Sequence, residues 1–342
     1  MAASMQPKAS HNECSNARLP QTMKAISLIR DDTTGVTPAS LKTVILPIPQ
    51  AKPGHLLVKI CAAAINPSDV LNWDGGFPYT TYPRVPGRDF AGVVEDGDSW
   101  WIGKKVFGSS GRSISFTQDG THAEYCQIPE GAAVPMPSVL SFAQAACIGV
   151  PWSTASIMLK RARVQPSDTA LVLGACGAVG SSAVQLARAK ACRVITAARR
   201  DFADINTATD SELTGVRDLT SGKGVDVVID TVGDPALMQN ALKVLAVRGR
   251  LCFIAAPRTA DALFSFNLKD LYRAEHSIVG CNSLQYDAEE IGANLCELID
   301  GFESGQHKAV PTKDIHTVPL EKATEAYEAV RRKDGRKYVI VW

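Results

Sequence analysis

The chain has 342 residues and an almost balanced charge, with 36 lysine and arginine residues against 35 aspartate and glutamate residues. This length suffices for two domains with sizeable cores, and the charge balance argues against nucleic acid as the main partner. No apolar stretch is long enough to span a membrane, and the nine cysteines are scattered without a C-x-x-C pair, as in reduced intracellular proteins. We therefore expect a cytoplasmic protein that binds neither nucleic acid nor membranes.

The first 22 residues are polar and contain no apolar segment of the kind found in secretory signals. We predict that residues 1–22 form a disordered extension. From Met23 onward the sequence is typical of β-structure, with apolar runs at 24–29, 41–47 and 55–60 that prolines and glycines separate. The first domain is therefore predicted to be rich in strands.

Residues 169–200 show a strand, a glycine turn, a helix and a second strand. The apolar run 170–173 is typical of a buried parallel strand, and an amphipathic run at 182–190 precedes a second strand at 193–197. The turn carries three glycines at G-x-x-G-x-x-G spacing, which are Gly174, Gly177 and Gly180. Glycines at this place allow a tight turn and the close approach of a pyrophosphate, which binds at the helix N-terminus. The pattern predicts a dinucleotide site.

The end of the second strand indicates which dinucleotide binds. An NAD site usually has an acidic residue about 20 positions beyond the motif, where it binds the ribose 2′-hydroxyl. Here Arg199 and Arg200 follow two alanines, and Asp201 comes only after them. Paired guanidinium groups suit a 2′-phosphate, so we predict NADPH as the cofactor. The predicted cofactor contacts in and beyond this unit are Gly174, Ala175, Gly177, Ala178, Val179, Gly180, Ala198, Arg199, Arg200 and Val232.

The segment after Arg200 is short. Two complete helix–strand steps would need two helices of about 11–12 residues with a strand and loops between them. Residues 201–224 have room for one helix, expected at 211–221, so the helix after the second strand is predicted to be lost. We expect this loss to weaken one wall of the adenine pocket. Further alternation of strands and helices, beginning with the buried strand 225–230, predicts a parallel sheet.

Five short motifs follow one another in a fixed order. They are Asn66 to Asp69 (N-P-x-D), Pro86 to Gly92 (P-G-x-D-x-A-G), Gly120 to Tyr125 (G-x-x-A-E-Y), Ile148 to Ala155 (I-G-x-P-x-x-T-A) and the glycine turn. In this order they resemble the medium-chain dehydrogenase/reductase superfamily, in its zinc-independent quinone oxidoreductase and enoyl reductase branch. The resemblance extends from Met23 to Trp342.

The resemblance implies an α/β protein of two domains. One is a GroES-like, partly open β-barrel catalytic domain, formed by residues 23–145 and 287–342. The other is a Rossmann-type NADPH-binding domain with a doubly wound parallel sheet, at residues 146–286. It also implies a homodimer formed by sheet edges around Leu263 to Val279, where Phe264-Ser265-Phe266 alternates as an edge strand would.

The resemblance also bears on metal binding. Zinc alcohol dehydrogenases of the superfamily bind a catalytic metal through two cysteines and a histidine, and the corresponding positions here are Asn66, Arg88 and Val150. These residues do not form the cysteine and histidine set that catalytic zinc prefers, and the chain has no four-cysteine structural lobe. His122 is interpreted as a packed or capping residue. We predict no metal site.

The resemblance implies roles for three further residues. Asn66 would lie near the nicotinamide and the substrate carbonyl, and its amide N–H would donate a hydrogen bond to the developing oxyanion. The alternative is that Asn66 only begins a turn, since Asn-Pro favours turns in any protein. Thr154 matches a position beside the nicotinamide ribose, with an ordinary threonine inside a helix as the alternative. Lys337 matches a basic position that reaches the cofactor, with a solvated pair of charges at Arg336 and Lys337 as the alternative.

The proton donor is less defined. Several related enoyl reductases have a catalytic tyrosine shortly after the Asn-Pro turn, whereas this chain has Leu71 and Phe77 at those positions. Tyr79 and Tyr82 lie just beyond and could reach in, with Tyr79 as the candidate donor, although a loop tyrosine usually only packs; water is the default. Asp69 and Arg88 are expected to pair structurally. An aromatic lining for a flat substrate is expected from Trp73, Phe77, Tyr79 and Trp152.

These observations favour an NADPH-dependent reductase that transfers hydride to a quinone or to the C=C bond of an α,β-unsaturated carbonyl, without zinc. Two alternatives stay open. One is an enoyl reductase that acts on an acyl or polyketide chain bound to a carrier. The other is an inactive NADPH-binding regulatory protein, which the missing tyrosines and the shortened segment after Arg200 both favour.

Overall fold

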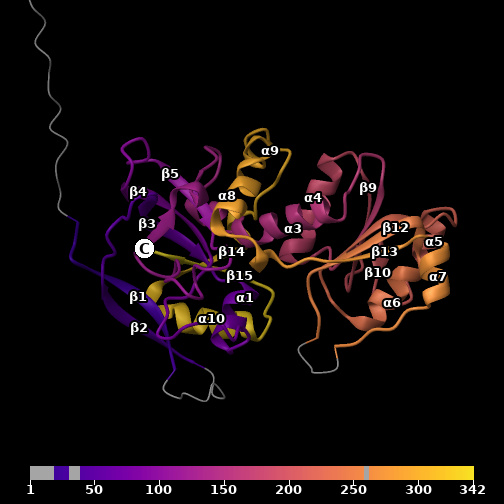
Figure 1. The fold of residues 1–342 in the computed structure, drawn as a ribbon, viewed down its shortest axis with the longest axis horizontal. Helices are drawn as coiled ribbons and strands as arrows, with labels where there is room; N and C mark the ends of the chain where they lie inside the picture. Colours follow the sequence, from indigo (N-terminus) through magenta and orange to yellow (C-terminus); the bar gives the residue numbers. More distant parts are fainter. Residues whose placement is uncertain (1–18, 31–38, 258–261) are drawn as a thin grey trace, which may run out of the picture.

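The computed structural model describes residues 19–30, 39–257 and 262–342, so the predicted extension at 1–22 lies almost entirely outside the described ranges. Within these ranges the chain folds into two bodies (Figure 1). One contains a six-stranded sheet, and the other contains a seven-stranded sheet and a small two-stranded sheet. In the described ranges, no helix has the length and apolar character needed to cross a membrane.

The six-stranded sheet is parallel throughout, with the order β10-β9-β8-β11-β12-β13. Its strands are β8 (Thr169–Leu173), β9 (Arg193–Ala198), β10 (Ile205–Asn206), β11 (Val225–Asp230), β12 (Leu245–Phe253) and β13 (Ser277–Gly280). The chain starts in the middle at β8, winds outward to β10, and then returns to β11 and winds the other way. The doubly wound order agrees with the prediction. It places a crevice at the carboxyl ends of β8 and β11, where the chain leaves these neighbouring strands toward opposite edges of the sheet.

Helices cover both faces of this sheet, which explains its uninterrupted apolar runs. Ala170 and Val172 of β8 lie in one core with α3 (Gly149–Arg161) and α4 (Ala178–Ala189). Leu171 and Leu173 lie in a second core with residues of α5 (Gly215–Leu219) and α6 (Pro235–Lys243). Successive strand residues therefore pack on opposite faces, and both faces are closed to water.

The segment after β9 confirms the predicted loss of a helix. A turn joins β9 directly to the two-residue strand β10, and α5 follows with only five residues instead of the expected 211–221. Its start is displaced because the Asp210 carboxylate accepts hydrogen bonds from the backbone N–H groups of Thr214 and Gly215, each at 2.9 Å. These contacts hold the backbone of residues 214 and 215, where α5 begins.

The other body is built on the order β14-β15-β3-β4-β5-β7, with β6 also paired to β3. Its strands are β3 (His55–Ala64), β4 (Asp89–Asp96), β5 (Lys105–Ser109), β6 (Tyr125–Pro129), β7 (Val134–Pro135), β14 (Ile315–Pro319) and β15 (Lys337–Val341). β1 (Thr22–Ile29) and β2 (Ser40–Pro47) form the small antiparallel sheet. Its helices are α1 (Pro67–Trp73), α2 (Phe142–Ala146), α8 (Ala288–Cys296), α9 (Ile299–Glu303) and α10 (Ala323–Arg331). Because β15 pairs with β3, the last residues of the chain complete the sheet that the strands between residues 55 and 135 begin.

The expectation of an edge strand at Phe264 to Phe266 is wrong. The edge of the parallel sheet is β13, and residues 262–267 have no strand assignment before α7 (Leu268–Arg273). Phe264 packs against the second core, and the Ser265 hydroxyl accepts a hydrogen bond of 3.2 Å from the Gln239 amide of α6. These contacts hold the segment against a helix. The predicted homodimer stays a prediction.

Candidate functional site

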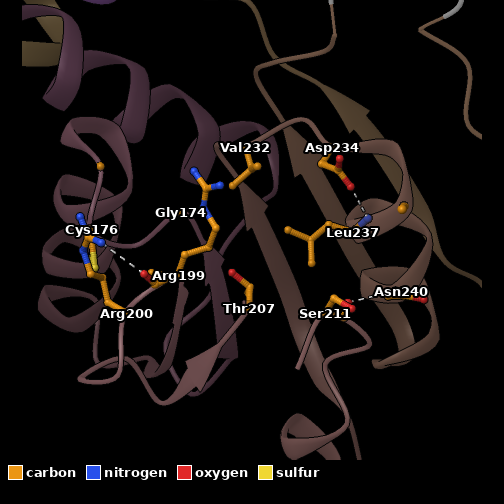
Figure 2. Close-up of a pocket in the computed structure, with 13 residues that line it drawn as sticks. Gly174, Cys176, Arg199, Arg200, Thr207, Ser211, Val232, Asp234, Leu237 and Asn240 are labelled. Carbon is orange, nitrogen blue, oxygen red and sulfur yellow. Dashed lines mark hydrogen bonds between the residues drawn. The ribbon is translucent and has the colours of Figure 1, made fainter. Parts of the chain in front are cut away.

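A pocket of about 560 Å³ opens at the carboxyl ends of β8, β9 and β11 (Figure 2). Six of the ten cofactor contacts predicted in and beyond the glycine turn line this pocket. The lining residues are Gly174, Cys176, Gly177, Ala198, Arg199, Arg200, Thr207, Ser211, Val232, Asp234, Ala236, Leu237 and Asn240. The predicted residues Gly174, Gly177, Ala198, Arg199, Arg200 and Val232 are therefore brought together around one pocket.

The glycine turn is shaped by close packing of β8 against α4. Gly174 has φ +75°, and a Cβ there would lie 2.5 Å from the Thr231 hydroxyl. A Cβ at Gly180 would overlap the carbonyl oxygen of Gly174, whereas one at Gly177 would lie 3.3 Å from that oxygen. The glycines therefore allow the helix to begin directly against the strand, which leaves the N-terminus of α4 at the pocket.

Four predicted contacts lie outside the pocket lining. Ala175 and Gly180 are buried behind the turn, and Ala175 donates a backbone hydrogen bond of 3.1 Å to Ala197. Ala178 and Val179 form the first turn of α4, where Ala178 is exposed and Val179 is half-buried against the core. Ala178 and Val179 therefore lie at the helix N-terminus, which a pyrophosphate would approach.

The charged groups of the pocket are mostly basic. Arg199 and Arg200 are exposed, and neither forms an ion pair with a residue in the described ranges. Asp201 accepts a hydrogen bond of 2.7 Å from Asn206, and the carboxylate of Asp234 accepts 2.8 Å from the backbone N–H of Leu237 at the start of α6. Both nearby carboxylates thus have local partners, while the two guanidinium groups are available to an anion.

The wall opposite the arginines is formed by α6 and by the segment that replaces the lost helix (Figure 2). Thr207, Ser211, Leu237 and Asn240 line it, and the Asn240 amide donates 3.0 Å to the carbonyl oxygen of Ser211. The shortened segment therefore still encloses the pocket. These four residues could not be predicted from the sequence, because no spacing or motif links residues 211 and 240, which only the folded chain brings together.

A second cluster lies around Asn66, at the start of α1. Its side-chain Oδ1 accepts a hydrogen bond of 2.9 Å from the Lys337 ammonium of β15, and its Nδ2 donates 2.8 Å to Oδ2 of Asp89 on β4. The other oxygen of Asp89 accepts 2.8 Å from the backbone N–H of Val150 in the first turn of α3. Asn66 and Asp89 are buried, and together they connect the two bodies of the protein.

These partners determine which way the Asn66 amide faces. An ammonium only donates and a carboxylate only accepts, so the amide oxygen must face Lys337 and the amide nitrogen must face Asp89. One of the two N–H groups on Nδ2 is used in this way. The alternative that Asn66 only begins a turn is therefore incomplete, because its side chain also connects three distant segments.

Thr154 lies one helical turn after Val150 on α3. It is buried, and its hydroxyl oxygen has no hydrogen-bond partner in the structure. A buried hydroxyl without a partner is unfavourable by about 1–3 kcal/mol, and such groups are commonly completed by a ligand or water. A dinucleotide whose ribose or carboxamide reaches Thr154 would supply the missing partner. This hydroxyl and the glycine turn both fit a nicotinamide dinucleotide.

Asp69 and Arg88 do not form the expected ion pair. The Arg88 guanidinium donates 2.9 Å to the Ser110 hydroxyl and 3.1 Å to the Ser68 hydroxyl. Asp69 accepts 2.7 Å from the backbone N–H of Asn66 through one oxygen, and its other oxygen has no partner. Burial raises the pKa of Asp69 to about 7, although the positive charge of Arg88 opposes this shift.

The positions that correspond to metal ligands do not fit zinc. Asn66 is held by Lys337 and Asp89, the guanidinium of Arg88 cannot act as a ligand, and Val150 has no donor in its side chain. In the described ranges no three or more histidine, cysteine, aspartate or glutamate side chains form a group suited to a metal. His122 is a packed residue, as predicted: its Nδ1 lies 2.7 Å from the Tyr327 hydroxyl, and burial lowers its pKa to about 4.

The aromatic residues divide into two sets. Phe77 and Tyr79 pack with Phe116, whose ring lies beneath Arg88. Within the described residues, the Tyr79 hydroxyl makes no hydrogen bond to Asn66, Lys337 or Thr154. Partial burial raises the pKa of Tyr79.

The expected aromatic lining is wrong for two residues. Trp73 is buried against Tyr327, with its indole N–H donating 2.6 Å to the Ala39 carbonyl oxygen. Trp152 packs between Phe302 and His307 in the core. Both indoles face inward because the helices that carry them bury that side, which the residue type alone does not reveal.

Comparison with known proteins identifies two matching regions. Residues 52–138 match the family described as "Alcohol dehydrogenase GroES-like domain", and residues 178–299 match "Zinc-binding dehydrogenase". The chain is 48% identical over 320 residues to "Zinc-type alcohol dehydrogenase-like protein C337.11" of Schizosaccharomyces pombe, covering 94% of this chain and 97% of that protein. It is 29% identical to a quinone oxidoreductase of Rattus norvegicus, covering 86% and 89%. The fold is similar to the crystal structure of AibC, with a TM-score of 0.82, 24% identity and coverage of 97% and 99%.

Proposed function

The chain belongs to the medium-chain dehydrogenase/reductase superfamily, and we propose that within it the protein is a zinc-independent, NADPH-dependent reductase of quinones or of the C=C bond of α,β-unsaturated carbonyls. The observation that carries this proposal is the network around Asn66. Asn66 and Val150, two of the positions that correspond by resemblance to the zinc ligands of metal-dependent relatives, are instead joined by hydrogen bonds to Lys337 and Asp89.

The choice of NADPH rests on the charges of the pocket. Arg199 and Arg200 directly follow β9, where the adenosine ribose of a dinucleotide lies in this fold. The carboxylate of Asp234 is engaged at the start of α6, and Asp201 is engaged by Asn206. A 2′-phosphate would therefore meet two guanidinium groups, whereas a 2′-hydroxyl would find no carboxylate ready to accept from it.

The choice of substrate follows from the absence of suitable zinc ligands at Asn66, Arg88 and Val150. A simple ketone needs a Lewis acid or a proton donor to polarise its carbonyl, whereas a quinone or an enone already has a C=C bond conjugated to its carbonyl. The bound dinucleotide supplies a hydride to the β-carbon of such a substrate. The protein then has to stabilise the negative charge that develops on the carbonyl oxygen.

The residues around Asn66 suit that task. The second amide N–H of Asn66 donates to the carbonyl oxygen of the substrate, while Lys337 and Asp89 prevent the amide from turning. The Lys337 charge polarises the amide and strengthens this donor. Thr154 binds the ribose through its free hydroxyl. Water protonates the resulting enolate, with Tyr79 as the alternative donor.

The test is binding and turnover by the purified full-length chain. We expect tighter binding of NADPH than of NADH, and oxidation of NADPH by menadione or cyclohexenone that a metal chelator does not reduce. Arg199→Ala and Arg200→Ala should each weaken NADPH binding about tenfold and leave NADH binding unchanged, because a charged hydrogen bond contributes about 1.5–3 kcal/mol. Arg188→Ala is the matched control, since Arg188 is exposed on α4 and does not line the pocket.

Each alternative has its own outcome in this test. NADPH binding without turnover of any quinone or enone would contradict the reductase and support a regulatory protein. Turnover limited to acyl chains attached to a carrier protein would support the carrier-dependent enoyl reductase. Equal affinities for NADPH and NADH, unaffected by either arginine substitution, would contradict the assignment of the cofactor.

A further inference from the structure

A buried arginine lies beside the first turn of α1. Arg88 directly precedes β4 and is only 4% exposed. Its guanidinium donates 2.9 Å from Nε to the Ser110 hydroxyl and 3.1 Å from Nη1 to the Ser68 hydroxyl. Ser68 follows Asn66 by two positions, so this contact brings the guanidinium next to the segment that carries the Asn66 amide. A positive charge is therefore held close to the residue proposed to bind the substrate carbonyl.

The Arg88 guanidinium forms no ion pair with a carboxylate in the part of the chain that the structure describes. Asp89 uses both of its oxygens, one for the Asn66 amide and one for the Val150 N–H. Asp69 uses one oxygen for the backbone N–H of Asn66, and its other oxygen has no partner. A guanidinium removed from water without a paired counter-charge is unfavourable, so an anionic group of a ligand would stabilise it.

The guanidinium keeps N–H groups for such a ligand. Two of its five N–H groups are used by the two serines, so three are left, on Nη1 and Nη2. Nη2 makes no hydrogen bond with any described residue, yet it is not fully enclosed, so a ligand can reach it. Neighbouring N–H groups of a planar guanidinium match the two oxygens of a carboxylate. Arg88 is therefore equipped to bind an anion that presents two oxygens.

An aromatic cluster extends from Arg88 to the surface. The Phe116 ring is centred 5.8 Å from the guanidinium carbon, and the rings of Phe77 and Tyr79 pack against Phe116 at centroid distances of 5.0 and 5.4 Å. Tyr79 is 44% exposed. Burial raises the pKa of the Tyr79 hydroxyl and the positive charge of Arg88 opposes this shift, so the charge acts at a residue that solvent reaches. The rings provide apolar surface for a flat, conjugated compound that enters past Tyr79.

We propose that Arg88 binds a carboxylate group of the substrate, and that the protein prefers α,β-unsaturated carbonyl compounds that carry one. The carbonyl oxygen is bound by the Asn66 amide, and the carboxylate is bound by the free N–H groups of Arg88. Two fixed contacts orient the C=C bond between them for hydride transfer. The inference rests on the proposed function for the reaction, whereas binding of a carboxylate at Arg88 requires no reaction.

The first experiment compares two substrates that differ in one charge. In trans-4-oxopent-2-enoate a carboxylate and a ketone lie at opposite ends of the C=C bond, and the methyl ester of this compound lacks the charge. An ester withdraws more electron density than a carboxylate, so intrinsic reactivity favours the ester as hydride acceptor. We expect kcat/KM with NADPH to be at least about tenfold higher for the carboxylate, because a charged hydrogen bond contributes about 1.4 kcal/mol or more. Equal values, or a preference for the ester, would overturn the inference.

Variants of two arginines locate the effect. Arg88→Gln removes the charge and should lower the ratio of the two kcat/KM values about tenfold, whereas Arg88→Lys keeps a charge without the planar fork and should retain part of the preference. Arg84→Gln is the matched control, because Arg84 is already paired with Asp119 at 2.8 Å and its loss should leave the ratio unchanged. Each ratio compares two compounds in one protein, so a partly unfolded sample does not alter it. An active Arg88→Gln protein with the wild-type ratio would contradict the inference.

A binding measurement separates this inference from the proposed function. The saturated product 4-oxopentanoate and its methyl ester are titrated by calorimetry into the wild-type protein and Arg88→Gln, with and without NADP⁺. We expect the carboxylate to bind at least about tenfold more tightly than the ester, in the wild type only. Turnover of both substrates with neither preferential turnover nor preferential binding of the carboxylate would refute the inference and leave the reductase intact. Preferential binding that depends on Arg88, without any turnover, would support the inference and contradict the reductase.

Discussion

Lys337 donates a hydrogen bond of 2.9 Å to the side-chain oxygen of Asn66, although 271 positions separate the two residues in the chain. Lys337 begins the last strand, and Asn66 ends the loop that follows β3. Their contact depends on the pairing of β15 with β3, in which Val339 lies opposite Ala64. The end of the chain therefore determines the orientation of an amide near its beginning, and with it the geometry of the candidate site.

The first prediction concerns this contact. Lys337→Met removes the ammonium that holds the Asn66 amide, and we expect kcat for NADPH oxidation to fall about tenfold, or about 1.4 kcal/mol. Arg336→Met is the control, because Arg336 is an exposed neighbour of Lys337 whose backbone N–H donates 3.0 Å to Asp334 and which has no hydrogen bond to Asn66 in the described ranges. Steady-state kinetics with menadione measure the effect. An equal loss in both variants would argue for a general change in charge.

Thr154→Val tests the buried hydroxyl that has no partner. Valine has nearly the same shape, so removal of the hydroxyl should leave the ligand-free protein as stable as wild type or more stable by about 1 kcal/mol. In contrast, dinucleotide affinity should fall, because the hydroxyl has its partner only in the complex. Chemical denaturation and dinucleotide titration measure the two effects. A large loss of stability without loss of affinity would contradict a binding role.

The glycine turn offers a matched pair of substitutions. Gly180→Ala would place a methyl group over the Gly174 carbonyl oxygen, and we expect it to lower the free energy of unfolding by about 1–3 kcal/mol. Gly177→Ala leaves 3.3 Å to the same oxygen and should cost less than about 1 kcal/mol. Denaturant unfolding of the two variants gives the comparison. Equal losses would show that the approach of α4 to β8 does not set the requirement.

Asp69 predicts a specific dependence of stability on pH. Because its pKa is raised from 3.8 to about 7 in the folded protein, its contribution is complete below pH 4 and is lost as the pH rises through 7. Asp69→Asn keeps an oxygen acceptor for the Asn66 N–H but cannot ionise. The difference in unfolding free energy between variant and wild type should therefore change in favour of the variant, by on the order of a few kcal/mol, between pH 4 and 8.

His122 changes the unfolding free energy with pH in the opposite direction to Asp69. The prediction is therefore tested on the difference in unfolding free energy between the variant and the wild type. The pKa of His122 is lowered to about 4, so His122 stays neutral in the folded protein and removes stability as the pH falls below about 6.5. This term is common to both proteins and cancels in the difference. A difference that stays constant across the range would show that Asp69 ionises normally.

Much of the fold was predictable from the sequence because its signals are local. The apolar run of β8, the three glycines and the amphipathic run of α4 each depend on residues close together in the chain. The loss of a helix after β9 followed from chain length alone. Arg199 and Arg200 were found in the same way, because the end of the second strand of this unit always meets the same part of the crevice.

Only the tertiary structure decided the partners of these residues. Asn66 meets Lys337 and Asp89, and Asn240 meets Ser211, because the folded chain brings together segments that are distant in sequence. The same holds for the inward direction of Trp152, which packing between α3 and α9 determines. The sequence by itself determined most strands of the parallel sheet and the glycine turn at which a dinucleotide is predicted to bind. The tertiary structure decided which polar groups are held and which stay free, since hydrogen bonds require short distances that only the closed sheets create.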